Sequence, residues 1–304
     1  MRYNESMKVA IIGAGELGTA FARVLGGKAD VALWDVDAAK VSGMKPLAET
    51  VALAEIIFCC VPSFAMRAAV VAFAPHVDIQ KTIVISLAKG IEAPTKKFMD
   101  KVLAELLPGG RSGVMGGPML AAELGGGEEC IGAVGFSNVA NARESADTIT
   151  ELFAGTNLDI EISDDPHGIA IAGVLKNIYA VLMGIAFGRK TSEDETAWLA
   201  ERAMGEMVAI GTHLGAHEAT MTGTAGFADF LATAYSVHSR NRAVGVALAI
   251  DGGPTIKGEG ILSLPSIIDL LGSDSARFSL LSALEGIVIK NQKSSEVFKN
   301  IFAR

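Results

Sequence analysis

A glycine-rich turn near the N-terminus has the residue types and spacing that bind a diphosphate. The segment Gly13-Ala14-Gly15-Glu16-Leu17-Gly18 follows an apolar run and opens a helical pattern, and Asp35 comes 22 residues after Gly13. Gly13 permits the tight turn, Gly15 lets the backbone approach a pyrophosphate, and Gly18 lets helix and strand pack closely. Asp35 can accept hydrogen bonds from a ribose 2′-hydroxyl, and its charge opposes a 2′-phosphate. The complete unit predicts a dinucleotide site rather than glycines that serve packing alone.

The same residues predict which dinucleotide is preferred. No arginine follows Asp35 before Lys40, so we expect NAD to be preferred over NADP. The alternative is that Lys40 or Lys45 folds back toward a 2′-phosphate.

Two lysines have surroundings that suggest chemistry. Lys89 directly follows a predicted strand, at the end that faces the ligand crevice of a doubly wound sheet. Lys176 and Asn177 interrupt the apolar segment 168–188. Burial lowers the pKa of a lysine and makes it a usable proton donor and acceptor near neutral pH. The alternatives are a solvated surface role for Lys89 and a Lys176 that reaches the surface along its stem.

The segment 168–188 is 21 residues long, which is enough to span a membrane. A lysine at the membrane centre costs about 2.5–3.5 kcal/mol, and no second span accompanies it. We therefore expect a buried helix and no stable membrane insertion.

Further polar residues follow in three short segments. Asp229 lies within 226–233 and could pair with a lysine, whereas Ser239-Arg240-Asn241-Arg242 offers guanidinium forks that suit a phosphate. From composition alone, a basic helical turn with a capping aspartate is the better explanation of these two segments. The segment 116–123 follows a strand and could line the same crevice or form a simple turn.

Composition excludes several classes of protein. Half of the residues are hydrophobic and 20% are charged, which excludes intrinsic disorder. The length of 304 residues favours two domains. Acidic residues outnumber basic ones by 34 to 26, so a nucleic-acid partner is not expected. The cysteines, Cys59, Cys60 and Cys130, are sparse and odd in number, as is typical of a reducing compartment. We expect a cytoplasmic protein.

The elements that must position these residues divide into two groups. Strands alternate with helices as far as Ser163, which predicts an N-terminal doubly wound (Rossmann) parallel sheet of the α/β class. The helices include one expected over 93–106. After Ser163 long helical patterns follow, among them 167–187, 193–214 and 227–250, so we expect an all-helical C-terminal domain. The predicted domains are 1–163 and 164–304, with a cleft between them.

Taken together, the chain resembles the NAD(P)-dependent glycerol-3-phosphate dehydrogenase family from Lys8 to about Gly260. The resemblance is carried by GAGxxGTA, KGIE at 89–92, GP..A.E at 117–123, LKN at 175–177, GxxDxxxT through Thr233, SRNR at 239–242, and Glu259-Gly260. It departs from the family at Leu17, where an aromatic residue is usual, and at Met119, where a small polar residue is usual. The segment of 26 residues between Asp35 and Pro62 is also shorter than in similar enzymes.

The resemblance implies a role for each matching residue. Lys176 would be the proton donor and acceptor, Lys89 would polarise the same region, and Asp229 would hold the Lys176 ammonium. The implied substrate ligands are Asn177, Thr233, Ser239, Arg240, Asn241 and Gly117. The implied cofactor ligands are Gly13, Gly15, Glu16, Leu17, Gly18, Asp35, Lys89, Ala121, Arg240 and Glu259, with no metal.

These roles predict an oxidoreductase that interconverts dihydroxyacetone phosphate and sn-glycerol 3-phosphate with NAD, or alternatively NADP, for glycerophospholipid synthesis. A homodimer is expected. One alternative is a ketopantoate or β-hydroxyacid reductase, against which the Ser239-Arg240-Asn241 phosphate ligands argue. Another is a dinucleotide-sensing protein without turnover, which would have no need of Lys176, Lys89 and Asp229 together.

Overall fold

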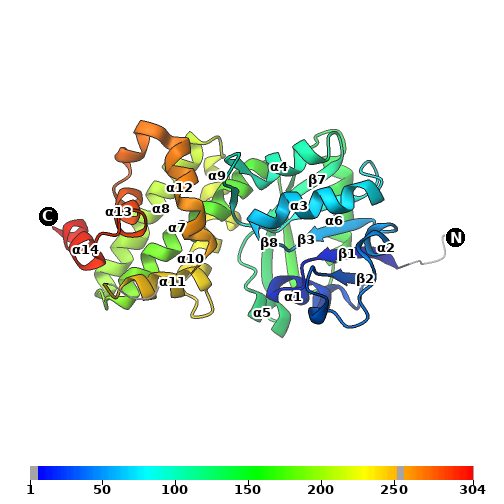
Figure 1. Cartoon of the computed structure of the whole chain (residues 1–304), viewed down its shortest axis with the longest axis horizontal. Helices are drawn as coiled ribbons and strands as arrows, with labels where there is room; N and C mark the ends of the chain where they lie inside the picture. Colours follow the sequence, from blue (N-terminus) through cyan, green and yellow to red (C-terminus); the bar gives the residue numbers. More distant parts are fainter. Residues whose placement is uncertain (1–5, 252–256, 304) are drawn as a thin grey trace.

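Seven strands form one sheet in the N-terminal half of the chain (Figure 1). The computed structural model describes residues 6–251 and 257–303; Met1 and Arg304, where the two predicted domains begin and end, lie outside them. Across the sheet the order is β2 (Ala29–Trp34), β1 (Met7–Ile12), β3 (Ile56–Cys59), β4 (Ile83–Ser86), β7 (Arg111–Gly116), β8 (Cys130–Phe136) and β9 (Leu158–Ser163). The first five strands are parallel, which confirms the doubly wound prediction for them.

The sheet departs from the predicted parallel arrangement at β8, which runs antiparallel to β7 and parallel to β9. The connection from β7 to β8 contains only the short helix α5 (Ala121–Gly126). Strand β8 therefore enters the sheet at the same end at which β7 leaves it, an arrangement that antiparallel pairing allows without a crossover along the sheet.

Helices cover both faces of the sheet. They are α1 (Glu16–Leu25), α2 (Leu47–Val51), α3 (Ser63–Phe73), α4 (Met99–Leu106) and α6 (Ala142–Phe153), with short 3₁₀ turns at Ala38–Lys40 and Ala74–His76. Strand β3 shows why, because its four residues are all buried. Phe58 lies in one core, where it contacts Phe21 and Phe153, whereas the next residue, Cys59, lies in the core on the opposite face. Successive residues of a strand point to opposite faces, so a continuous apolar run needs cover on both sides.

The helix predicted over 93–106 is wrong in its first half. A small hairpin of β5 (Ile91–Glu92) and β6 (Lys97–Phe98) precedes α4, which starts at Met99. Between the two strands Lys96 has a φ of +55°, a backbone conformation that no helix contains. The chain is therefore turned back before the helix begins.

The C-terminal half is helical, and no strand occurs among the residues described after Ser163. Its elements are α7 (Pro166–Gly188), α8 (Glu193–His213), α9 (Glu218–Thr222), the π-helical turn η3 (Thr224–Ala228), α10 (Asp229–Tyr235), α11 (Arg240–Leu248), α12 (Glu259–Leu271), the 3₁₀ turn Gly272–Arg277, α13 (Ser279–Val288) and α14 (Ser294–Phe302). The single helix predicted over 227–250 is wrong, because a loop at 236–239 separates α10 from α11.

Helix α7 is the centre of this half, and α8, α10, α11 and α12 pack around it (Figure 1). Every residue from Gly168 to Ala186 is buried, and the Asp165 side chain caps the start of the helix by accepting from the Gly168 N–H. The helix is long and apolar enough to cross a membrane, but its most apolar window is wholly buried inside the protein. It is therefore the core helix that the sequence predicts.

Candidate active site

A cluster of charged side chains lies buried where the sheet meets the helical half. Lys89, just after β4, and Lys176, in the middle of α7, both pair with Asp229 at the start of α10. The Lys89 Nζ to Asp229 Oδ2 distance is 2.6 Å, and the Lys176 Nζ to Asp229 Oδ1 distance is 3.1 Å. Lys176 also donates to the Thr233 hydroxyl at 2.7 Å, and Lys89 donates to the Gly117 carbonyl at 2.8 Å. Residues that are far apart in the sequence thus meet in one network.

Burial sets the electrostatics of this cluster. The Lys176 side chain is 6% exposed, which excludes a lysine that reaches the surface along its stem. Loss of solvent lowers the pKa of Lys176 to about 8, although the Asp229 carboxylate opposes the shift. Burial acts to raise the pKa of Asp229, but the two lysines hold it below its usual value. Two ammonium groups therefore share one carboxylate, which leaves an excess positive charge that suits an anionic ligand.

Hydrogen bonds between side chains fix the cluster from both halves of the molecule. Asn177 donates to the Lys89 carbonyl at 2.9 Å, and Asn241 donates to the Asn177 side-chain oxygen at 2.8 Å. The Gly260 N–H in turn donates to the Asn241 side-chain oxygen at 3.0 Å. This chain of contacts joins the loop after β4 to α7, α11 and α12, so the segments that carry the two lysines are tied together by hydrogen bonds.

The glycine-rich turn has the geometry that its three glycines predict. Gly13 has a φ of +110°, and a side chain on Gly18 would collide with the Gly13 carbonyl. Gly15 has no atom within 4 Å of where a Cβ would stand, so its backbone is open to an approaching group. Leu17 packs against the core below, whereas the turn faces a cavity of about 600 Å³. The cavity is lined by Ala14, Gly15, Glu16, Thr19, Ala20, Arg23, Ala121, Ala122, Gly125 and His238.

Glu259 links the two halves beside this region. The Ser63 hydroxyl donates to Glu259 at 2.8 Å and the Ser63 N–H donates at 3.2 Å. A side chain on Gly90 would collide with both residues, so this glycine lets the loop that carries Lys89 pass between them. Sequence reasoning missed Ser63, although its place directly after β3 and Pro62 was a usable signal.

The remaining predicted substrate ligands have different surroundings. The Ser239 hydroxyl caps α11 by accepting from the Arg242 N–H at 3.2 Å, so its first role is structural. Arg240 is exposed, and its Nε donates to the Lys257 carbonyl at 3.1 Å. Met119 packs into the core beside Gly132, not into the lysine cluster.

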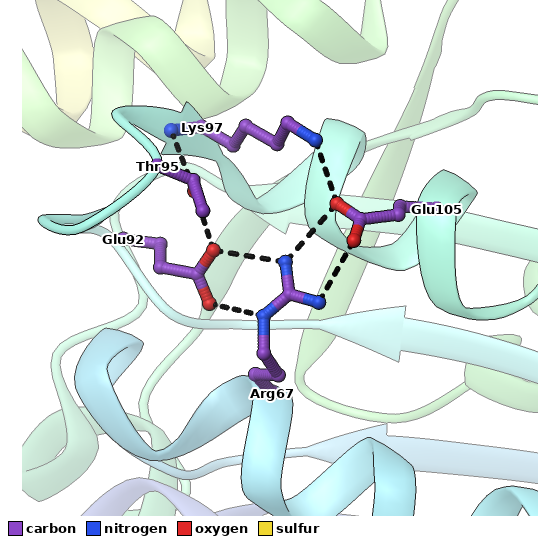
Figure 2. A network of polar contacts seen from close by, with 5 residues as sticks. All are labelled: Arg67, Glu92, Thr95, Lys97 and Glu105. Carbon is purple, nitrogen blue, oxygen red and sulfur yellow. Dashed lines mark hydrogen bonds and ion pairs between the residues drawn. The ribbon is translucent and has the colours of Figure 1, made fainter.

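A second ion network lies beyond the lysine loop, and sequence reasoning missed it (Figure 2). The Arg67 guanidinium on α3 binds both oxygens of Glu92 at 2.7 and 2.9 Å and both oxygens of Glu105 at 2.9 and 3.1 Å. Lys97 pairs with Glu105 at 2.7 Å, and Thr95 donates to Glu92. Since Glu92 stands three residues after Lys89, this network holds the far end of the lysine loop.

In the described parts of the chain, no group of three or more His, Cys, Asp or Glu side chains is arranged to hold a metal ion. The three cysteines are free. The lysine cluster and the glycine turn are the two features on which the candidate site is built.

Comparison with known proteins shows the family. The sequence profile described as NAD-dependent glycerol-3-phosphate dehydrogenase C-terminus matches residues 165–299, and the corresponding N-terminus profile matches 38–142. A glycerol-3-phosphate dehydrogenase [NAD(P)+] from Pseudomonas entomophila is 31% identical, over 92% of this chain and 84% of the relative. This chain belongs to the NAD-dependent glycerol-3-phosphate dehydrogenase family.

Solved structures agree with this family. The glycerol-3-phosphate dehydrogenase of Coxiella burnetii superposes with a TM-score of 0.85 at 25% identity, covering 97% of this chain and 98% of that one. A ketopantoate reductase from Ralstonia eutropha reaches a TM-score of 0.62 at 19% identity, covering 96% of this chain and all of that one. The second likeness shows a shared fold only, so the ketopantoate reductase alternative is not favoured.

Proposed function

We propose that this member of the glycerol-3-phosphate dehydrogenase family interconverts dihydroxyacetone phosphate and sn-glycerol 3-phosphate, with Lys176 as its acid–base residue. The observation that carries the proposal is the buried Lys176 ammonium, held between Asp229 and Thr233. A proton donor with a pKa of about 8 is matched to work near neutral pH. Membership of the family supports the substrate and the reaction.

The residues fit a nicotinamide dinucleotide. The open Gly15 and the cavity above the turn give room for a pyrophosphate at the N-terminus of α1, where free N–H groups and the helix dipole favour anions. When bound, the cofactor supplies or accepts the hydride. Ala14 and Gly15 would lie along the pyrophosphate, Ala121 would lie across the cavity from them, and Asp35 would lie beside the adenosine ribose.

The protein's own part in the reaction is electrostatic stabilisation and proton transfer. As the carbonyl carbon is reduced, negative charge develops on its oxygen, and Lys176 stabilises that charge and delivers a proton from Nζ. Asp229 holds the ammonium in place, and Lys89 adds a second positive charge. Arg240 and Asn241 would bind the phosphate and hydroxyl groups of the substrate with Thr233 and Asn177, and Gly117 would lie along it.

The same proposal includes the finer assignments that the sequence predicts. These are the domains 1–163 and 164–304, a homodimer, a cytoplasmic location and a supply of glycerol phosphate to lipid synthesis. The change from strand to helix between Ser163 and Pro166 supports the division into domains. Light scattering during size-exclusion chromatography measures the oligomeric state.

The decisive test is the oxidation of NADH by the purified protein with dihydroxyacetone phosphate, with ketopantoate, and with no substrate. We expect rapid oxidation only with dihydroxyacetone phosphate. Oxidation with ketopantoate alone would support the related reductase, whereas tight NADH binding without turnover on either would support a sensing protein.

A further inference from the structure

Asp35, at the end of β2, is held in place by the backbone on two sides. Its Oδ2 accepts from the Ala14 N–H of the glycine turn at 2.8 Å, and its Oδ1 accepts from the Asp37 N–H at 2.9 Å. Partial burial acts to raise the pKa of Asp35, but these backbone donors and Lys40 hold it below the usual value. The carboxylate is therefore a fixed negative charge at the edge of the turn.

Lys40 lies directly against this charge. Its Nζ is 3.3 Å from both carboxylate oxygens, and its side chain is 46% exposed whereas that of Asp35 is 8% exposed. The ammonium therefore sits on the solvent side of Asp35. In a dinucleotide-binding unit an acidic residue at this position lies beside the ribose 2′ position. An ammonium group in contact with it lies within reach of a 2′-phosphate.

We propose that Lys40 is a specificity-determining residue that lets this site accept a 2′-phosphorylated dinucleotide despite Asp35. The proposal rests on the proposed function, because it needs a nicotinamide dinucleotide in the cavity above the glycine turn. With NADH, Lys40 stays paired with Asp35, and the carboxylate accepts from the ribose hydroxyl. With NADPH, the ammonium bridges Asp35 and the phosphate, which offsets the repulsion between two anions.

The neighbouring charges support Lys40 as the group responsible. Asp37 is an exposed carboxylate on the same segment, and it caps the short 3₁₀ turn by accepting from the Ala39 N–H. Its negative charge adds to the repulsion of a 2′-phosphate by Asp35, so binding of that phosphate depends more strongly on a nearby cation. Lys45 is also exposed, but among the described residues no ion pair involves its side chain. Lys45 therefore serves as a matched control with the same charge on the same segment.

The experiment compares Lys40→Met, Lys40→Arg and Lys45→Met with the wild-type protein. For each, kcat/KM is measured for NADPH and for NADH at saturating dihydroxyacetone phosphate. We expect Lys40→Met to lower the NADPH-to-NADH ratio about tenfold, because one ion contact to the phosphate is lost. Lys40→Arg should keep the ratio within about threefold of wild type, since it keeps the charge, and Lys45→Met should change it less than twofold.

An unchanged ratio in Lys40→Met, or an equal fall in Lys45→Met, overturns the proposal. If the wild-type protein does not turn over dihydroxyacetone phosphate, the proposed function fails, and the dissociation constants of NADPH and NADH from fluorescence titration test the Lys40 role separately. A tenfold fall in that affinity ratio still supports Lys40. Failure of the wild-type protein to bind either dinucleotide overturns both proposals.

Discussion

The two ion networks on either side of the Lys89 loop differ in burial and in charge balance. In the buried cluster, two lysines share Asp229, and the side chains of Lys176 and Asp229 are 6% and 2% exposed. In the network around Arg67, two cations meet two carboxylates, and Arg67 and Glu105 are 32% and 42% exposed (Figure 2). The first network lies between the two halves of the molecule, and the second lies within the N-terminal half.

The difference matches the roles expected under the proposed function, in which one network stabilises the fold and the other receives an anion. In a balanced, partly exposed network the opposite charges neutralise each other. The bidentate contacts of Arg67 with Glu92 also give its hydrogen bonds favourable geometry. A buried network with one carboxylate for two ammonium groups carries a desolvation cost that its own members do not fully offset. Under the proposed function, a bound anionic substrate would supply the missing negative charge.

The largest expected effect comes from removing the buried charge itself. Lys176→Met keeps the volume of the side chain but removes its charge and proton, so kcat should fall about 10²- to 10⁴-fold. Binding of NADH, measured by fluorescence, should stay nearly intact, because the glycine turn and Asp35 are untouched. The matched control is Lys97→Met in the balanced network, for which kcat should change less than about twofold. If Lys176→Met retains more than a tenth of wild-type kcat, Lys89 becomes the candidate for the proton donor.

The next effect concerns the substrate's own charge. If Arg240 makes a charge-assisted contact to the phosphate, Arg240→Ala should lower kcat/KM for dihydroxyacetone phosphate about 30- to 1000-fold. Unphosphorylated dihydroxyacetone, which lacks that anion, should be reduced at almost the same slow rate by both proteins. An equal loss on both substrates would instead show that Arg240 acts by holding the Lys257 carbonyl.

These predictions use residues that the sequence could supply, because each lies in a local motif. The turn Gly13–Gly18, the strand that ends before Lys89 and the apolar helix around Lys176 are all set by nearby residues, and the structure contains them. What the sequence could not supply is the antiparallel β8, the hairpin before α4 and the pairing of Arg67 with Glu92, because none of these features leaves a periodic signal.

The dependence of activity on pH should show the coupling within the buried cluster. Reduction needs the protonated form of Lys176, so kcat/KM for dihydroxyacetone phosphate should fall as pH rises through about 8. Asp229 raises the pKa of Lys176, so Asp229→Asn should move this limb of the profile to lower pH. A profile measured from pH 6 to 10 checks the shift, since a range of about four units covers the limb of the wild-type protein and the shifted limb of the variant. A limb that stays at the wild-type pH in Asp229→Asn would show that another group titrates.

The smallest effect should distinguish the two arms of the Arg67 network. Glu92 and Glu105 bind the same guanidinium with the same fork geometry, but only Glu92 continues the strand that follows Lys89. Glu92→Gln weakens the anchor of that loop, so kcat should fall about three- to tenfold, the scale of a weakened hydrogen bond between charged groups, with KM for NADH unchanged. Glu105→Gln weakens the contact between Arg67 and α4, and it should lower the melting temperature without a matching loss of kcat. Equal losses of kcat in the two variants would show that the network stabilises the N-terminal half but does not position Lys89.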